Sequence, residues 1–212
     1  MRKYLAEFIG TFFLVFTVGM TVLPYPPTIT GIIPPLAIGS ILMTMIFAGG
    51  HISGGHFNPA VTLAVWLRGK CSVADVPGYW IAQFVAGVVA AYAALYLHGS
   101  PVVPPPAPPD TARYLLGEFL FTFALCYVVL NAATSRDHPN NSFYGLAIGF
   151  TVLAGAFAVG PVTGGAFNPA VALGLVVMGL KGMGALWVFL VANLLGGLAA
   201  ALAFRFLNPE DV

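Results

Sequence analysis

The chain has 212 residues, of which 59% are hydrophobic and 7% charged, and its formal net charge is +1. Soluble domains carry about a quarter charged residues, so the charges here are too few to cover a surface that faces water. The composition predicts a membrane protein surrounded by lipid, with nothing to indicate nucleic-acid binding. Cys71 and Cys126 suggest neither a disulfide scaffold nor a metal site, and no cofactor is expected.

Six hydrophobic segments are predicted to be transmembrane helices, because each is near the ~20 residues that cross the hydrocarbon layer. They cover residues 4–24, 34–51, 74–98, 111–133, 142–160 and 183–207. The first segment looks like a signal peptide, since Arg2 and Lys3 precede it. However, its Glu7 has a counterpart in Glu118, where no signal peptide lies.

Two further apolar segments, 58–68 and 168–179, are predicted to be helices too short to cross the membrane. They begin with the same three residues, Asn58-Pro59-Ala60 and Asn168-Pro169-Ala170. Asn is favoured as a helix N-cap and Pro at the first helical position. The glycine pairs that precede them, Gly54-Gly55 and Gly164-Gly165, permit a tightly turned backbone. At membrane depth such backbone is tolerated where it is buried in protein or lines a water-filled cavity.

The two halves of the chain repeat each other. The segment from Ile52 to Leu63 matches the segment from Val162 to Leu173 at 8 of 12 positions, at an offset of 110 residues (168 − 58). Glu7 and Glu118 precede the two Asn-Pro-Ala motifs at nearly equal distances, and Gln83 and Asn193 follow them at equal distances. We expect a first repeat over 1–100, a Pro-rich linker over 101–110 and a second repeat over 111–212.

Each repeat contains three spans, so the second must be inverted relative to the first. The predicted fold is an all-α membrane protein of six transmembrane helices plus two half-helices. With the N-terminus inside, six basic residues are cytoplasmic and two are outside, which satisfies the positive-inside rule. Both chain ends are then cytoplasmic. The inside residues are Arg2, Lys3, Arg68, Lys70, Arg136 and Arg205, and the outside residues are Arg113 and Lys181.

Interrupted hydrophobic segments at corresponding places in two halves indicate a transport site at the membrane midplane. Inverted symmetry brings the two half-helix starts together there, each with a side-chain amide and roughly half a positive charge. Loop carbonyls supply acceptors, so neutral hydrogen-bonding molecules are expected to pass and cations to be disfavoured. The expected pore-lining carbonyls are those of Gly54, Gly55, His56, Gly164 and Ala166.

Glu7 and Glu118 are the intramembrane acids of the two repeats, and such residues are functional by default. One hypothesis makes them proton-relay groups. The favoured hypothesis is structural, in which each carboxylate accepts N–H bonds from the irregular loop of its own half. His56 is interpreted either as a carbonyl contributor with a packed ring or as a gating residue.

Together, the paired Asn-Pro-Ala motifs, the paired Glu residues and the spacing of the repeats resemble the aquaporin (major intrinsic protein) family over essentially the whole chain. The segment from His51 to Val61 is similar to bacterial water channels. The resemblance implies a right-handed bundle with a pore in every protomer, a homotetramer, and a location in the bacterial inner membrane.

The departures from the family's pattern concern the outer constriction. Val171 stands where most members carry an Arg, and the other constriction positions, carried over by spacing, are Ile38, Ala156 and Gly165. Ala172 stands where glycerol facilitators tend to have Asp. The set is small and apolar and is most similar to arsenic-linked bacterial aquaporins. The resemblance therefore implies neutral solutes such as water, glycerol, arsenite and methylated arsenicals.

Three other functions are alternatives to this solute channel. A strict water channel differs only in the width of the constriction. An alternating-access transporter also uses inverted repeats and broken helices, but it usually needs ion-coupling carboxylates in the pore. An enzyme is not expected, because the sequence offers no nucleophile–base pair, metal cluster or phosphate-binding loop.

Overall fold

The computed structural model describes residues 1–23, 31–99 and 110–211. Within these ranges the chain is helical, and six helices are long and apolar enough to cross a membrane. The long helices are α1 (Arg2–Val22), α2 (Ile33–Ser53), α4 (Val76–Leu97), α5 (Thr111–Val129), α6 (Tyr144–Thr163) and α8 (Leu186–Leu207). The short ones are α3 (Pro59–Leu67) and α7 (Pro169–Val177). The predicted all-α class with six spans and two shorter helices is confirmed.

Several predicted boundaries need correction. The spans expected to end at 51 and 160 continue to Ser53 and Thr163, because the hydroxyl of each last residue bonds a buried glutamate. α6 therefore continues past Pro161, which lies inside it. α7 ends at Val177 rather than 179, because Gly179 takes the left-handed conformation (φ +74°) that ends helices. The sequence did not predict the π-helical turn (Leu130–Thr134) after α5 or the 3-10 turn (Met183–Ala185) before α8.

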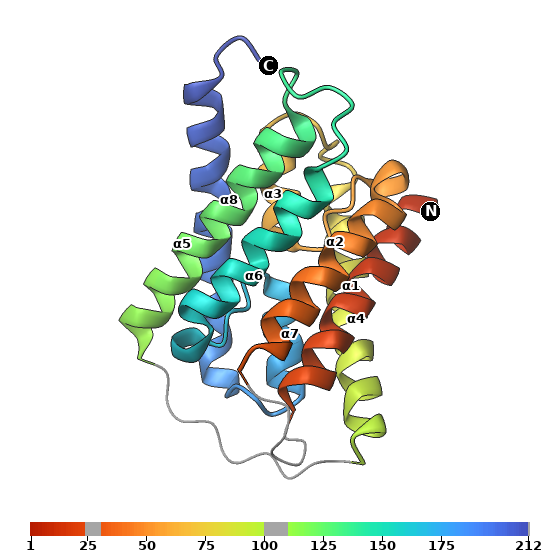
Figure 1. The fold of residues 1–212 in the computed structure, drawn as a ribbon, viewed down its shortest axis with the longest axis vertical. Coiled ribbons are helices and arrows are strands. Elements are labelled where there is room, and N and C mark those ends of the chain that lie inside the picture. Colours follow the sequence, from red (N-terminus) through yellow and green to blue (C-terminus); the bar gives the residue numbers. More distant parts are fainter. Residues whose placement is uncertain (24–30, 100–109, 212) are drawn as a thin grey trace.

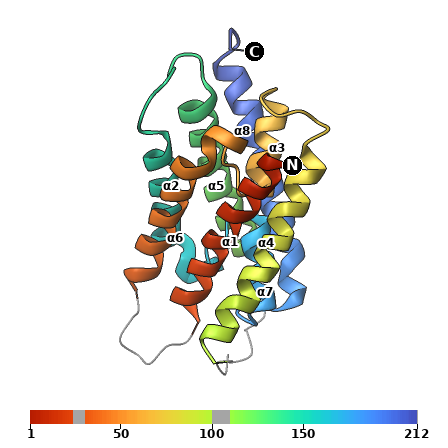
Figure 2. The same cartoon turned by 90° about the vertical axis from the view of Figure 1, so that its right-hand side faces the viewer.

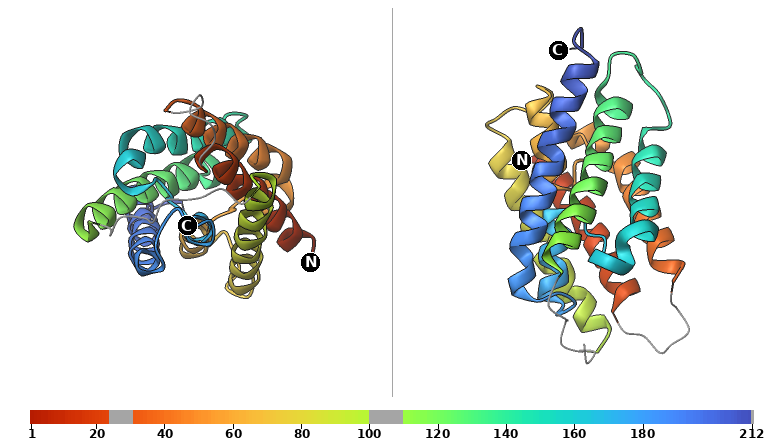
Figure 3. Two further views of the ribbon diagram at one scale, coloured as in Figure 1. Left: turned by 90° about the horizontal axis from the view of Figure 1, so that it is seen from below. Right: turned by 90° about the vertical axis from the view of Figure 1, so that its left-hand side faces the viewer.

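The long helices run side by side, and the short helices enter the bundle from opposite ends (Figures 1, 2 and 3). α3 lies at the end that carries both chain termini, called here the α3 end, and α7 lies at the opposite α7 end (Figure 1). α1 runs away from the α3 end and α5 runs toward it, as an inverted arrangement requires. The predicted linker at 101–110 falls almost wholly outside the described residues, so the division into two repeats stays a prediction.

Each short helix packs on a long helix of the other half, α3 on α8 and α7 on α4. A glycine on each long helix lets the short helix pack close to it. A Cβ on Gly87 would lie 2.7 Å from the carbonyl oxygen of Ala170, and one on Gly197 would lie 2.6 Å from that of Ala60. Because real Cβ atoms do not approach so closely, a larger residue at Gly87 or Gly197 would push a half-helix away from the midplane.

The distribution of polarity is that of a membrane protein. Large apolar side chains such as Ile81 and Leu202 are exposed on the outside of the bundle, where they can contact lipid. The polar side chains of Glu7, Glu118 and Asn193 are instead fully buried. The interior polar groups must therefore satisfy one another, and they meet around the two short helices.

Candidate functional site

Two loops with the same backbone geometry precede the short helices. Gly54 and Gly164 end α2 and α6 in the left-handed region, with φ of +92° and +99°. Phe57 and Phe167 also have positive φ, +49° in both cases, a conformation that costs about 1–2 kcal/mol for a residue with a side chain. The loops therefore need outside hydrogen bonds to hold this shape.

Glu7 supplies those bonds to the first loop. Its Oε1 accepts from the hydroxyl of Ser53 (2.7 Å) and the N–H of His56 (2.9 Å). Its Oε2 accepts from the N–H of Phe57 (2.6 Å) and the side-chain amide of Gln83 (2.8 Å). The carboxylate is fully buried, and all four donors come from its own half of the chain.

Glu118 makes the same set of bonds in the second half. It accepts from Thr163 Oγ1 (2.7 Å), Ala166 N (3.0 Å) and Phe167 N (2.8 Å). Its fourth donor is Asn193 Nδ2, at 3.0 Å. Neither carboxylate lines the central cavity described below, so both face the loops rather than a solute path.

Asn58 and Asn168 begin the two short helices and meet at the centre of the molecule. Each side-chain oxygen accepts the N–H two residues ahead, from Ala60 (2.8 Å) or Ala170 (2.9 Å). Each side-chain nitrogen donates across to the other loop, Asn58 to the Phe167 carbonyl (2.8 Å) and Asn168 to the Phe57 carbonyl (2.9 Å). An amide nitrogen carries two hydrogens, and this cross-bond uses one, which leaves one donor of each Asn for a solute.

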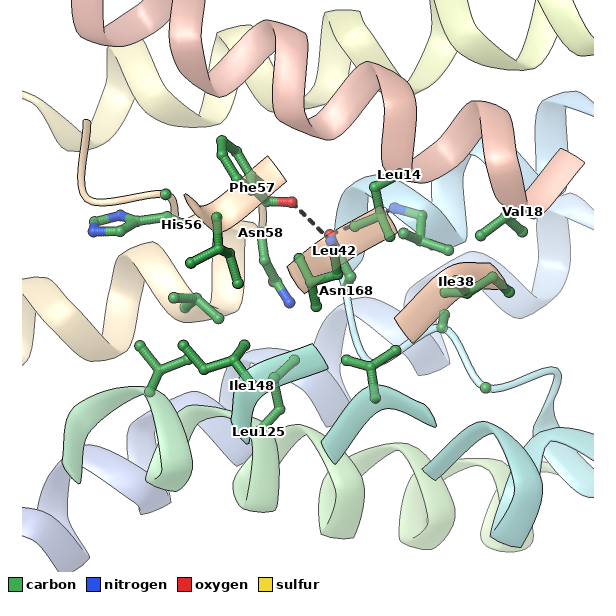
Figure 4. Close-up of a pocket in the computed structure, with 18 residues that line it drawn as sticks. Leu14, Val18, Ile38, Leu42, His56, Phe57, Asn58, Leu125, Ile148 and Asn168 are labelled. Carbon is green, nitrogen blue, oxygen red and sulfur yellow. Dashed lines mark hydrogen bonds between the residues drawn. The ribbon is translucent and has the colours of Figure 1, made fainter. Parts of the chain in front are cut away.

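A central cavity passes between the two asparagines (Figure 4). The space free of atoms there is about 470 Å³, counted together with its open ends, but only about 30 Å³ of it admits the centre of a water molecule. Since one water needs roughly 10–15 Å³ of such space, water fits there in a short single file. Apart from the asparagines and the loops, the lining is apolar, with side chains from α1, α2, α5 and α6 such as Leu14, Leu42, Leu125 and Val152.

Wider cavities adjoin it at both ends. The cavity at the α7 end, of about 680 Å³, shares Ile38 and Gly165 with the central one. The cavity at the α3 end, of about 880 Å³, shares His56 and Val129. The three cavities therefore form one row through the bundle, parallel to its long helices.

The predicted site residues lie in this row with some exceptions. The four constriction positions meet at the α7 side, where Ile38, Gly165 and Val171 line the central cavity and Ala156 lines the adjoining one. Of the predicted loop positions, Gly55, His56 and Ala166 line the central cavity, while Gly54 and Gly164 line the outer ones. Pro59, Ala60, Pro169 and Ala170 do not line the central cavity; they are buried in the first turns of the short helices.

The His56 ring is packed against its neighbours, and the gating role stays a prediction. Its ring stacks on Tyr79 at a centroid distance of 5.0 Å, and its Nδ1 lies 3.2 Å from Thr62 Oγ1. The residue nevertheless lines both the central cavity and the one at the α3 end. The ring is thus held in place beside the path.

The sequence matches the family model described as "Major intrinsic protein" over residues 1–204. The chain belongs to this family. It is an integral multi-pass membrane protein and a channel of the aquaporin and aquaglyceroporin type, for water or small neutral solutes, and not an enzyme. No cluster of three or more His, Cys, Asp or Glu that could hold a metal occurs among the described residues.

Its relatives include bacterial and plant members of the major intrinsic protein family. The chain is 38% identical to "Glycerol uptake facilitator protein-like 6" of Lactiplantibacillus plantarum, over all of both chains. It is 34% identical to "Aquaporin NIP1-4" of Oryza sativa subsp. japonica, over 98% of this chain and 77% of the relative. The aquaglyceroporin structure from Plasmodium falciparum shares the fold, with a TM-score of 0.81 at 22% identity, covering 99% of this chain and 97% of the other.

Sequence reasoning missed more than half of the residues that line the central cavity of this major intrinsic protein. The side chains from α1 and α5 (Leu14, Val18, Leu125 and Val129) and several from α2 and α6 were not predicted. The repeat offset is the signal that finds some of them, since Ile148 lies 110 residues after Ile38 (148 − 38).

Proposed function

We propose that the chain is a passive channel for small neutral solutes of about the size of glycerol, urea or arsenite, with water passing as well. The observation that carries the proposal is the pair of asparagine amides, which offer two donors at the centre of an otherwise apolar path. A solute with hydroxyl or amide groups replaces some of its lost water hydrogen bonds there. The first relative's name refers to glycerol uptake, which supports the same solute class.

Cations are excluded by the two short helices. Asn58 and Asn168 cap α3 and α7, and each helix start carries roughly half a positive charge. The two starts face each other across the cavity, so a cation meets positive potential from both sides. A water file is also forced to reverse its orientation at the two donors, which opposes proton conduction.

The α7-side constriction of Ile38, Ala156, Gly165 and Val171 is proposed to be wider and less polar than in an ordinary water channel. An Arg in place of Val171 would add a fixed charge and five N–H donors. Val adds two methyl groups, so selection by charge and by hydrogen bonding is weak at these four positions. Compact uncharged metalloid hydroxides, arsenite among them, fit this description.

We further propose that the α3 end is cytoplasmic in a bacterial inner membrane, from the excess of basic residues at that end. By family resemblance, the channel assembles as a homotetramer with one path per protomer. The exposed apolar side chains that cover the long helices are then divided between lipid and neighbouring protomers.

Stopped-flow light scattering of proteoliposomes tests the function, with water, glycerol, urea and arsenite measured in parallel. We expect all four to permeate faster than in protein-free liposomes, at rates unaffected by proton or sodium gradients. Rates that follow an ion gradient would favour a transporter. Fast water with the other three excluded would favour a strict water channel, the second candidate, which the small free space of the central cavity supports.

A further inference from the structure

The two halves of the channel wall have the same backbone frame. A Cβ on Gly55 would lie 3.6 Å from the Cα of Ile46, and a Cβ on Gly165 would lie 3.6 Å from the Cα of Ala156. Ile46 and Ala156 also differ by the repeat offset of 110 residues (156 − 46). These two residues therefore occupy equivalent places, one on each side of the asparagines.

The side chains on that frame are not equivalent. Ile46 lines the central cavity on the α3 side, and its counterpart Ala156 has three fewer carbon atoms. His56 likewise lines the α3 side, where its counterpart on the α7 side is Ala166. Both differences place the larger side chain on the α3 side. The wall is narrowed there although the backbone spacing is the same.

Among the other lining pairs only Leu42 and Val152 differ, by one carbon, and they lie midway between the two sides, four residues from Ile46 and Ala156 along α2 and α6. Ile148 corresponds to Ile38 and Val61 to Val171, each pair with the same residue type. Ile46 and Ile148 are only 2% and 4% exposed, whereas Ile38 and Ala156 are half-buried beside the cavity at the α7 end. Ile38 and Ala156 are therefore more open to solvent on the α7 side than Ile46 and Ile148 are on the α3 side.

We propose that the size-selecting constriction of this channel is an inner ring on the α3 side, formed by Ile46, Ile148, Val61 and His56. The four α7-side positions are then a wider mouth that does not limit flux. The proposal rests on the proposed function as a solute channel. Three of the four members are aliphatic, so the inner ring discriminates by size, and His56 contributes the polar edge along which a hydroxyl-bearing solute passes.

Exchange of the equivalent residues tests this. Ile46→Ala, Ala156→Ile and the double variant are reconstituted, and the ratio of glycerol to water permeability is measured for each. We expect Ile46→Ala to raise the ratio by about tenfold, the lower end of what one methylene contributes to discrimination in an apolar pocket. Ala156→Ile adds a second ring like the first, and two equal barriers in series lower glycerol flux only about twofold.

An unchanged ratio in Ile46→Ala, together with a steep loss of glycerol flux in Ala156→Ile, would place the limit at the α7 side and overturn the proposal. Ile46→Val, which removes one carbon, should give an intermediate ratio and decides the matter if Ile46→Ala fails to fold. The proposed function is judged separately. If wild type excludes glycerol, that function fails as stated, whereas the inner ring still predicts that Ile46→Ala admits glycerol.

Discussion

The replacement of Glu7 by Ala removes the acceptor for four buried donors at once. These are the hydroxyl of Ser53, the N–H groups of His56 and Phe57, and the amide of Gln83. A buried donor left unpaired costs about 1–3 kcal/mol, so the four together cost at least ~4 kcal/mol on the same scale. For a chain of this size each kcal/mol lowers the melting temperature by about 2–4 °C. We therefore expect a fall of at least ~8 °C on that conversion.

Thermal unfolding in detergent measures this effect, with three companion variants. Glu118→Ala should match Glu7→Ala, because Glu118 also accepts four bonds. Glu7→Gln should lie between wild type and Glu7→Ala, because it keeps an acceptor oxygen but turns an N–H toward the other donors. Glu210→Ala is the control, since Glu210 is exposed and such changes stay within about 0.5 kcal/mol.

The structural role would be refuted if Glu7→Ala melted within ~2 °C of wild type. On the same conversion, that difference is a loss of less than ~1 kcal/mol in the free energy of unfolding. The same conclusion would follow if Glu7→Ala folded normally and altered proton conductance. The second outcome, a change in proton conductance, would assign the carboxylate to a proton relay rather than to the support of the loop.

Three further predictions concern the path and its α3 end. The double variant Asn58→Ala/Asn168→Ala should remove most solute flux and lower the free energy of unfolding by about 0.5–2 kcal/mol per cap. Unchanged flux in this variant would exclude the asparagines from the path. Asn58→Asp keeps the helix cap but adds a negative charge, so it should instead admit cations. Val171→Arg should reduce glycerol and arsenite flux far more than water flux. Val171→Leu is the control, because it adds bulk without charge. Equal losses of flux for all solutes would instead indicate general misfolding. Asp211→Asn should lower the melting temperature at neutral pH, because Asp211 pairs with Arg68 (2.5 Å) and Arg136 (3.1 Å). Burial raises the pKa of Asp211, but hydrogen bonds from Arg136, Ser135 and Arg68 outweigh it and hold the pKa at about 2. A folded-state pKa below the unfolded value of about 3.9 gives stability that is present above that value and lost as the pH falls toward the folded one. The gap between wild type and Asp211→Asn in a melting series should thus close in that range, and a gap independent of pH would contradict the ion pairs.

The sequence was sufficient for the parts of the structure that polar residues mark. A polar or helix-breaking residue is conspicuous in an apolar chain. The positions of Asn58 and Asn168 therefore predicted the starts of the short helices, and the two glutamates predicted the contacts to the loops. The channel wall was harder because lipid and protein interior are equally apolar. Leu5 and Leu14 lie on the same helix and are chemically identical, yet Leu5 is 60% exposed and Leu14 lines the cavity at 4%.

Contacts between distant parts of the chain were also outside the reach of local patterns. Asp211 meets Arg68 across 143 residues, and no spacing rule connects them. The pairing of Ile46 with Ala156 was present in the repeat offset, but its meaning needed the shared backbone frame. Only then does the difference between the two side chains become a difference in the width of the path.

The central claim is that neutral solutes pass while ions do not, and one preparation of proteoliposomes tests both halves of it. Glycerol-driven swelling is followed by light scattering, and proton and potassium leak under an imposed potential is followed by dyes at the same protein density. We predict glycerol flux that rises with protein density, with ion leak equal to that of protein-free liposomes. Ion leak that rises with protein density, or glycerol flux no faster than through lipid alone, would contradict the account.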